Sequence, residues 1–166
     1  MNRLAQTLTG VLSAAILAAH AMAASPEEMI KGAKDLDAAF LKAFNEHNVE
    51  AVIPLYWNSP ETVSMPPDAM VAKGHQAIKE SFAQMVVTMQ GCTLELTESH
   101  YMPIGDVVAT WGLWRMTMPG PDGKPLELLG RYTDLKAQKD GQWVYVMDHA
   151  SMPAPPPPAP EPAPKH

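Results

Sequence analysis

The last strand-like segment of this 166-residue sequence places a carboxylate beside an imidazole, at Asp148 and His149. Such groups can transfer protons together, because a carboxylate can orient an imidazole that acts as acid and base. The segment from Gln142 to Met152 is predicted as a strand, however, and consecutive strand residues point to opposite faces. Asp148 and His149 therefore cannot act on each other, and a partner for Asp148 must come from another strand.

Arg131 is the partner that the predicted final hairpin supplies. Asp140-Gly141 is typical of a tight two-residue turn with positive φ. The resulting register places Arg131 and Asp148 on one face, diagonally across the two strands. There they could orient a polar ligand group, or act as an acid/base group and its electrostatic partner. A structural ion pair without catalysis is the simpler interpretation.

The same register assigns the hairpin residues to two faces. The more apolar face is predicted to be concave and to line a pocket. It carries Arg131, Thr133, Leu135, Ala137, Val144, Val146, Asp148 and Ala150. The predicted convex face carries Tyr132, Asp134, Lys136, Gln138, Trp143, Tyr145, Met147 and His149. A bulged turn would shift the register by one residue and bring His149 inward, opposite Arg131, and this alternative stays open.

Aromatic and methionine side chains are the other candidates for a pocket lining. They suit flat or flexible apolar ligands, although core packing is the alternative role for each of them. Trp111 and Trp114 lie three residues apart on one strand, so only one can face the pocket, and Trp114 is preferred. The predicted ligand-binding residues are Phe40, Tyr56, Trp57, Met65, Met85, Trp114, Met116, Thr133, Val146 and His149.

Three helical patterns precede four strand-like segments. The first helix begins at Ser25, an N-cap followed by Pro26 and by Glu28 at the capping-box position. A short helix follows Asn48, and a third runs from Gly74 to about Met89. Alternating segments then begin near 93, 107, 126 and 142, joined by turns. This order predicts an α+β fold with the helices packed in a curved antiparallel sheet.

Both ends of the chain have a different character from the domain. Residues 1–23 read as a cleavable signal peptide with cleavage near Ala23, which implies a periplasmic or secreted protein. Residues 153–166 are mostly Pro and Ala, which favours an extended disordered tail. Residues 24–152 are expected to form a single domain, with no association with the membrane once the signal is removed.

Composition excludes several classes of function. The net charge is −6 and no basic stripe is present, which argues against nucleic-acid binding. The single cysteine, Cys92, cannot form an internal disulfide and is expected to be buried. No two histidines lie at metal-ligand spacing, and no nucleophile, phosphate-binding or dinucleotide motif occurs. Neither a metal nor another cofactor is therefore expected.

The chain resembles the nuclear transport factor 2-like superfamily, in particular its SnoaL-like branch and the branch called domain of unknown function 4440. The resemblance covers most of residues 27–152 and rests on short motifs in a fixed order. They are the segment from Ala43 to Val52, Leu55-Tyr56, Met65-Pro66-Pro67, Gly74 to Ile78, Gly130 to Thr133, Asp140 to Trp143, and Asp148 to Ser151. It implies a cone-shaped fold whose open end holds an apolar pocket, often in a homodimer.

Ketosteroid isomerase is one member of that superfamily, and it uses a tyrosine, an aspartate base and a protonated aspartate. The resemblance places Phe40 at the tyrosine position, Ser64 near the base and Thr133 at the protonated aspartate. These side chains lack the required chemistry, so steroid-type isomerisation is disfavoured.

Three functions follow as hypotheses. The first is an exported protein that binds a small apolar or amphipathic molecule in its pocket. The second is a cofactor-free isomerase, cyclase or lyase that uses Asp148 with Arg131. The third is a homodimeric association module with a vestigial pocket. Dimerisation is expected through the convex face, where aromatic residues such as Tyr132, Trp143 and Tyr145 would otherwise be exposed.

Overall fold

The computed structural model describes residues 24–154. The predicted signal peptide and nearly all of the predicted tail lie outside these residues. Within them, no helix is long and apolar enough to cross a membrane. The helices are α1 (Pro26–Asn45), α2 (Val49–Val52), the 3₁₀ turn η1 (Ile53–Leu55) and α3 (His75–Thr88). The strands are β1 (Val63–Met65), β2 (Ala72–Lys73), β3 (Thr93–Ile104), β4 (Val107–Pro119), β5 (Pro125–Lys139) and β6 (Gln142–Ser151).

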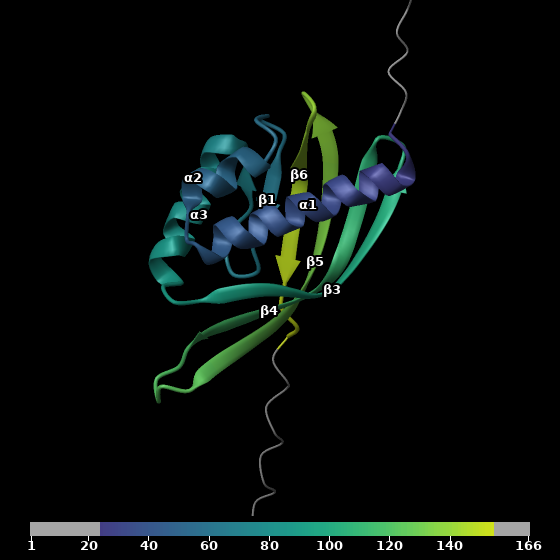
Figure 1. Cartoon of the computed structure of the whole chain (residues 1–166). Coiled ribbons are helices and arrows are strands. Elements are labelled where there is room, and N and C mark those ends of the chain that lie inside the picture. The colour runs from purple at the N-terminus through teal and green to yellow at the C-terminus, as the bar shows by residue number, and fades with distance from the viewer. Residues whose placement is uncertain (1–23, 155–166) are drawn as a thin grey trace, which may run out of the picture.

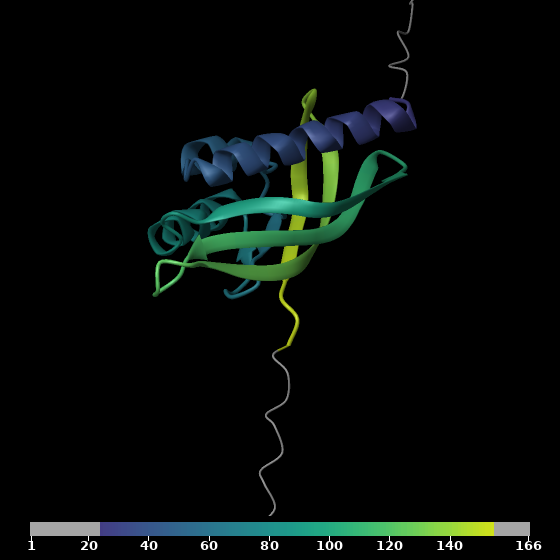
Figure 2. The ribbon, with the colours of Figure 1, turned by 60° about the horizontal axis from the view of Figure 1, so that its bottom comes forward.

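The six strands form one sheet in the order β2-β1-β6-β5-β4-β3. Strands β3 to β6 are joined by consecutive antiparallel hairpins, and only β1 and β6 pair in parallel among the described strands. The sheet is strongly curved, and all the helices lie on its concave side (Figures 1 and 2). The predicted α+β fold, with helices packed in a curved antiparallel sheet, is confirmed.

Helix α1 lies across the concave face of the sheet (Figure 2). It begins as predicted, because the Ser25 side chain accepts from the Glu28 backbone N–H and the Glu28 carboxylate accepts from the Ser25 backbone N–H. Gly32 allows close contact with the sheet: a Cβ there would lie 2.0 Å from the Trp143 indole. The helix buries one charged residue, Asp37, among its apolar contacts.

The final hairpin turn has the predicted conformation, with positive φ at Asp140 and Gly141. The predicted pairing continues from the turn as far as Lys136 opposite Tyr145. A bulge then shifts the register, so that Leu135 pairs with Met147 and Val146 is the extra residue. The bulge lies inside the hairpin rather than in the turn.

The predicted assignment of faces is wrong along β5. Tyr132, Asp134 and Lys136 are buried on the concave side, while Arg131 and Thr133 are exposed on the convex side. On β6 the bulge reverses the alternation. Tyr145 is therefore concave before it and Asp148 is concave after it. Asp148 faces inward as predicted, but because of a bulge that the sequence reasoning did not place.

Candidate functional site

A cavity of about 100 Å³ lies between the helices and the concave face of the sheet. Most of its lining is apolar or aromatic, and one end is polar. Its lining residues from the helices and the β1 region are Asp37, Phe40, Phe44, Tyr56, Ser64, Pro66, Pro67, Phe82, Met85 and Met89. Those from the larger strands are Leu94, Leu96, Trp114, Met116, Tyr132, Asp134, Tyr145, Asp148 and Ala150.

Trp114 forms part of the apolar wall because its neighbour on β5 is a glycine. A Cβ at Gly130 would lie 2.1 Å from the indole ring, so no larger residue fits beside it. The indole Nε1 donates to the backbone carbonyl of Arg131 at 3.1 Å. This wall is therefore held in place by backbone contacts rather than by a partner side chain.

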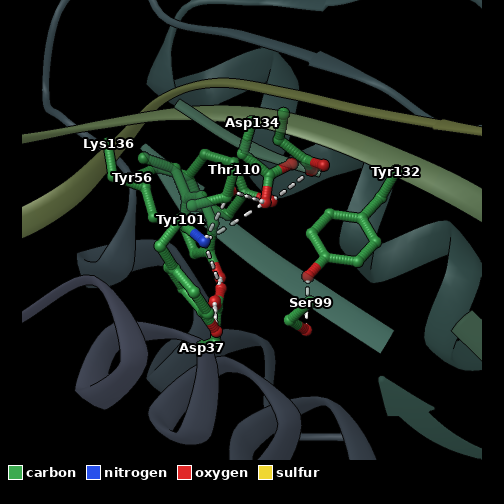
Figure 3. Close-up of polar contacts among 10 residues, drawn as sticks. Asp37, Tyr56, Ser99, Tyr101, Thr110, Tyr132, Asp134 and Lys136 are labelled. Carbon is green, nitrogen blue, oxygen red and sulfur yellow. Dashed lines mark hydrogen bonds and ion pairs between the residues drawn. The ribbon is translucent and has the colours of Figure 1, made fainter. Parts of the chain in front are cut away.

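Behind the polar end lies a fully buried lysine. Lys136 Nζ lies 2.6 Å from Asp37 Oδ1 and 3.4 Å from Asp134 Oδ2, and it donates to Thr110 Oγ1 at 2.9 Å. The hydroxyls of Tyr145 and Tyr101 donate to the two Asp37 oxygens, at 2.6 and 2.9 Å (Figure 3). Because a buried charge is costly unless it is paired and hydrogen-bonded, Asp37 and Lys136 can lie in the interior only as this set.

Asp148 forms the second half of the polar end. Its Oδ2 accepts from the Tyr56 hydroxyl at 2.6 Å and from Ser64 Oγ at 3.0 Å. Ser64 is positioned by the parallel pairing of β1 with β6, which places it opposite Asp148. Tyr56 follows η1, and the next backbone N–H, of Trp57, donates to the Tyr145 carbonyl. Two short segments, the end of η1 and strand β1, therefore hold this carboxylate.

Asp134 and Asp148 are directly paired across β5 and β6, and both line the cavity. Burial raises the pKa of Asp134 well above its ordinary value, and the negative charge of Asp148 raises it further, against the lowering effect of Lys136. Burial also raises the pKa of Asp148, although hydrogen bonds from Tyr56 and Ser64 oppose that rise. Ionisation of one carboxyl group opposes ionisation of its neighbour, so the pair is suited to sharing one proton.

The shared proton gives the polar end both a donor and an acceptor of protons. The proton belongs to the pair, because burial raises the pKa of both carboxyl groups. The hydroxyl of Tyr56 already donates to Asp148, and burial raises its pKa well above the ordinary value, so it stays protonated. The carboxyl pair, rather than the tyrosine, is therefore the group suited to acid–base chemistry.

Six of the sequence-predicted site residues line the cavity. They are Phe40, Tyr56, Met85, Trp114, Met116 and Asp148. Whether they bind a ligand or act in catalysis stays a prediction.

The predicted pairing of Arg131 with Asp148 is wrong. Arg131 is exposed on the outer face, where its Nε donates to Ser151 Oγ at 3.1 Å. Thr133 and His149 pair with each other across the strands, and neither lines the cavity. The open alternative that brought His149 inward is also wrong, because the bulge keeps Asp148 on the concave face.

Three further predicted lining residues lie elsewhere. Val146 is the extra residue at the bulge. The Trp57 ring lies beneath Lys139, with the Nζ 4.9 Å from the ring centroid. Met65 does not line the cavity, whereas Ser64 and Pro66 on either side of it do.

Sequence reasoning missed Asp134 and the buried set behind it. The polar character of Asp134 and Lys136 suggested that these residues face outward. The neighbouring Thr133 was therefore assigned to the pocket instead. The part of the argument against steroid-type isomerisation that rested on Thr133 therefore does not hold, whereas the parts that rested on Phe40 and Ser64 are unaffected. A usable signal was present: Asp37 lies at the edge of an apolar helical stripe, and Asp134 and Lys136 lie two apart on one strand. Together they could have indicated a buried charge set.

Among residues 24–154, no group of three or more His, Cys, Asp or Glu side chains is arranged to hold a metal ion.

Comparison with solved structures identifies many proteins of the same fold. One is a nuclear transport factor 2-like superfamily protein from Salmonella enterica serovar Typhimurium, with a TM-score of 0.71 and 21% identity, covering 82% of this chain and 99% of that one. Another is a candidate dehydratase of the same family from Streptomyces avermitilis, with a TM-score of 0.71 and 17% identity, covering 78% and 100%. A third is a candidate aromatic ring hydroxylase from Novosphingobium aromaticivorans, with a TM-score of 0.66 and 20% identity, covering 80% and 94%.

At these identities, the structural likeness shows the fold alone. A comparison with curated protein sequences finds no significant match. A model of the SnoaL-like domain matches residues 38–146, which include the C-terminal part of α1, all elements from α2 to β5 and the first part of β6. The resemblance to the branch called domain of unknown function 4440 is not confirmed. The chain belongs to the SnoaL-like domain family, and its fold is similar to that of solved nuclear transport factor 2-like proteins.

Proposed function

We propose that this protein binds a small apolar or amphipathic molecule in the cavity, with a polar group of the ligand against Asp134 and Asp148. The observation that carries the proposal is the combination of an apolar lining with one polar end, in a cavity of about 100 Å³. Pockets that bind small molecules are mostly apolar and contain a few converging polar groups that fix orientation. A core that serves packing alone would instead be expected to exclude two adjacent carboxyl groups that lack a close cation.

Binding of indole, a small neutral ring with one donor, tests this proposal. Saturation-transfer NMR should detect contact with the wild-type protein, and titration calorimetry should give a dissociation constant. Ala150→Trp fills the cavity and should weaken binding at least about tenfold, which corresponds to about 1.4 kcal/mol. Val87→Trp, at an exposed position of α3, is the matched control and should bind as the wild type does.

Leu96→Trp is a second variant of the lining, in case Ala150→Trp fails to fold. Thermal unfolding of each variant separates loss of the pocket from loss of the fold. Absence of indole contact with the folded wild type, or binding that both folded lining variants retain, would contradict the proposal.

Cofactor-free proton transfer is the second candidate function, with Asp148 as the base and Asp134 as the group that shares its proton. The specific observation that favours it is the direct pairing of two carboxyl groups whose pKa values are both raised. Raised pKa values bring carboxyl groups nearer to the range in which acid–base catalysis is efficient. Arg131 takes no part, because it lies on the other face of the sheet.

A screen of enolisable aromatic ketones for exchange of α-protons in D₂O tests this second function by NMR. Exchange that is catalysed by the wild type and lost in Asp148→Asn is expected. Exchange that survives Asp148→Asn would remove Asp148 from the mechanism.

We also propose that two copies associate through the convex face of the sheet. Five large apolar side chains alternate outward there and are 42–58% exposed, namely Met102, Ile104, Trp111, Leu113 and Leu129. They lie on the neighbouring strands β3, β4 and β5, so they form one surface. Tyr132, Trp143 and Tyr145 are not part of this surface, since they face the helices or the cavity. Sedimentation should give a dimer for the wild type and a monomer for Leu113→Glu.

Export remains part of the proposal. The supporting observation is the sequence of residues 1–23, with a basic start, an apolar stretch and small residues before the expected cleavage point. N-terminal sequencing of protein from a periplasmic fraction should begin near Ala24. Protein that retains Met1 in the cytoplasm would contradict it.

A further inference from the structure

The charged groups around the cavity do not balance. Three aspartates line it, and within residues 24–154 no lysine, arginine or histidine does. Lys136 lies behind the wall with its side chain fully buried, and its shortest ion-pair contact is with Asp37. The single buried cation therefore compensates one carboxylate well and leaves two with little compensation.

Asp134 and Asp148 are those two groups. Asp134 reaches the same Lys136 Nζ only at 3.4 Å. Asp148 receives hydrogen bonds from two neutral hydroxyls, those of Tyr56 and Ser64, and has no ion-pair partner among the described residues. A hydroxyl donor stabilises a carboxylate less than a cation does, so this end of the cavity keeps an excess of negative charge.

Aromatic rings supply an independent indication of the kind of ligand. Seven of the lining residues are aromatic: Phe40, Phe44, Tyr56, Phe82, Trp114, Tyr132 and Tyr145. The face of an aromatic ring carries partial negative charge and attracts cations, most strongly where water is excluded. The fold already uses this interaction, because Lys136 Nζ lies 5.1 Å from the centroid of the Tyr145 ring.

We propose that the ligand of this cavity is a small aromatic or aliphatic amine, whose ammonium group lies against Asp134 and Asp148 and whose apolar body lies against the aromatic wall. This inference rests on the proposed binding function and names the class of ligand. An anionic ligand would face the uncompensated carboxyl groups as well as the net charge of −6 of the chain. A neutral alcohol would gain hydrogen bonds but would leave the excess charge in place.

Three one-ring probes of nearly equal size test the charge of the ligand directly. They are 2-phenylethylamine, 2-phenylethanol and phenylacetate, each titrated calorimetrically into the purified full chain at pH 7. We expect the amine to bind at least about tenfold more tightly than the alcohol, and phenylacetate to show no binding over the same concentration range. Equal or tighter binding of the alcohol or of phenylacetate would overturn the inference, and this comparison needs no variant.

Asp148→Asn removes the charge and keeps the shape of the side chain. This variant should weaken binding of the amine at least about tenfold and change the affinity for the alcohol by less than about threefold. Asp106→Asn, in the exposed turn between β3 and β4, is the matched control and should bind all three probes as the wild type does. If Asp148→Asn fails to fold, Asp134→Asn makes the same test. An amine affinity that both folded variants retain would contradict the assignment of the carboxyl pair.

Proton release gives a second readout that a merely structural carboxyl pair would not produce. An entering ammonium favours ionisation of both carboxyl groups, so the shared proton should leave to the buffer. The apparent binding enthalpy of the amine should then differ between Tris and phosphate, while that of the alcohol should not. Failure of this inference is distinct from failure of the proposed function. If indole binds and the amine shows no preference, only the charge assignment is wrong; if neither binds, the binding function is wrong too.

Discussion

The two faces of β5 depart from the usual distribution of polar and apolar residues. Its inward face carries Tyr132, Asp134 and Lys136, all almost fully buried. Its outward face carries Leu129, which is 58% exposed, and continues with large apolar residues of β3 and β4. In most antiparallel sheets the apolar residues face the core and the polar ones face water. Here the inward face buries two charged residues, Asp134 and Lys136, although charged side chains such as Arg131 also lie on the outward face.

The difference teaches that burial depends on the partners of a group, and its polarity alone does not decide it. Lys136 has three partners within 3.4 Å, contributed by α1, β4 and β5. No single strand could supply them, so the cost of burying the lysine is offset only in the folded chain. The large apolar side chains of the outward face are 42–58% exposed, which is why we propose that a second copy covers them.

The largest test of this comparison removes the buried cation. Lys136→Met keeps much of the side-chain volume but leaves Asp37 without its ion-pair partner. We expect the free energy of unfolding to fall by about 3–5 kcal/mol, as for other broken buried pairs. Urea denaturation at pH 7 measures it. The matched Lys124→Met, at an exposed position, should change the stability by less than about 0.5 kcal/mol, and an equal loss in both would refute the contrast.

A smaller effect on the free energy of unfolding is expected from the hydroxyls of two of the tyrosines that line the cavity. Tyr56 donates to the Asp148 carboxylate at 2.6 Å, whereas Tyr132 donates to the neutral Ser99 hydroxyl at 2.7 Å. Tyr56→Phe should therefore lower the free energy of unfolding by about 1.5–3 kcal/mol, and Tyr132→Phe should lower it by about 0.5–1.5 kcal/mol. Chemical denaturation of both variants at pH 7 makes the comparison, and a larger loss at Tyr132 would show that the Asp148 contact is unimportant.

The carboxyl pair should make stability depend on pH. Because the pKa values of Asp134 and Asp148 are raised in the folded state, the folded protein binds more protons than the unfolded chain. Their contribution is therefore present at low pH and is lost as the pH rises from the unfolded value near 4 through the folded values. The slope is at most about 1.4 kcal/mol per pH unit for each proton.

Urea denaturation between pH 4 and 8 measures that slope. The difference in stability between Asp134→Asn and the wild type should grow in favour of the variant as the pH rises. Asp106→Asn, on the surface, should follow the wild-type profile. A profile for Asp134→Asn that runs parallel to the wild type would show that this carboxyl group does not bind the extra proton.

The smallest effect is expected on the outer face. Arg131→Ala removes an exposed side chain whose hydrogen-bond partner is Ser151. The free energy of unfolding should therefore change by less than about 0.5 kcal/mol. Binding of indole and of 2-phenylethylamine should also stay at the wild-type level. A loss of binding comparable to that of Asp148→Asn would restore Arg131 to the site and break the contrast between the two faces.

The fold could be predicted largely from local patterns. The capping box at Ser25, the turn at Asp140-Gly141 and the alternating segments after residue 93 each specify structure through contacts close in sequence. The site could be predicted only in part. Apolar lining residues such as Phe40 and Trp114 could be predicted from periodicity, because the spacing of apolar residues indicates which side of a helix or strand is buried.

Asp134 and Lys136 could not be placed in this way. The alternation of β5 is equally regular on both faces, and choosing the inner one needed a long-range fact, the presence of Asp37 on α1. The position of the bulge also lay beyond the sequence, since one extra residue can be inserted at several points of a hairpin.

The sequence by itself determined the elements, their order and the apolar character of the pocket, because these depend on spacing within each segment. Only the tertiary structure decided which face of the final hairpin is buried and which carboxyl groups lie on that face. That decision depends on contacts between segments far apart in the chain, the ion pair of Asp37 with Lys136 and the hydrogen bond from Tyr56 to Asp148. Such energies exist only once those segments have come together, so no local pattern records them.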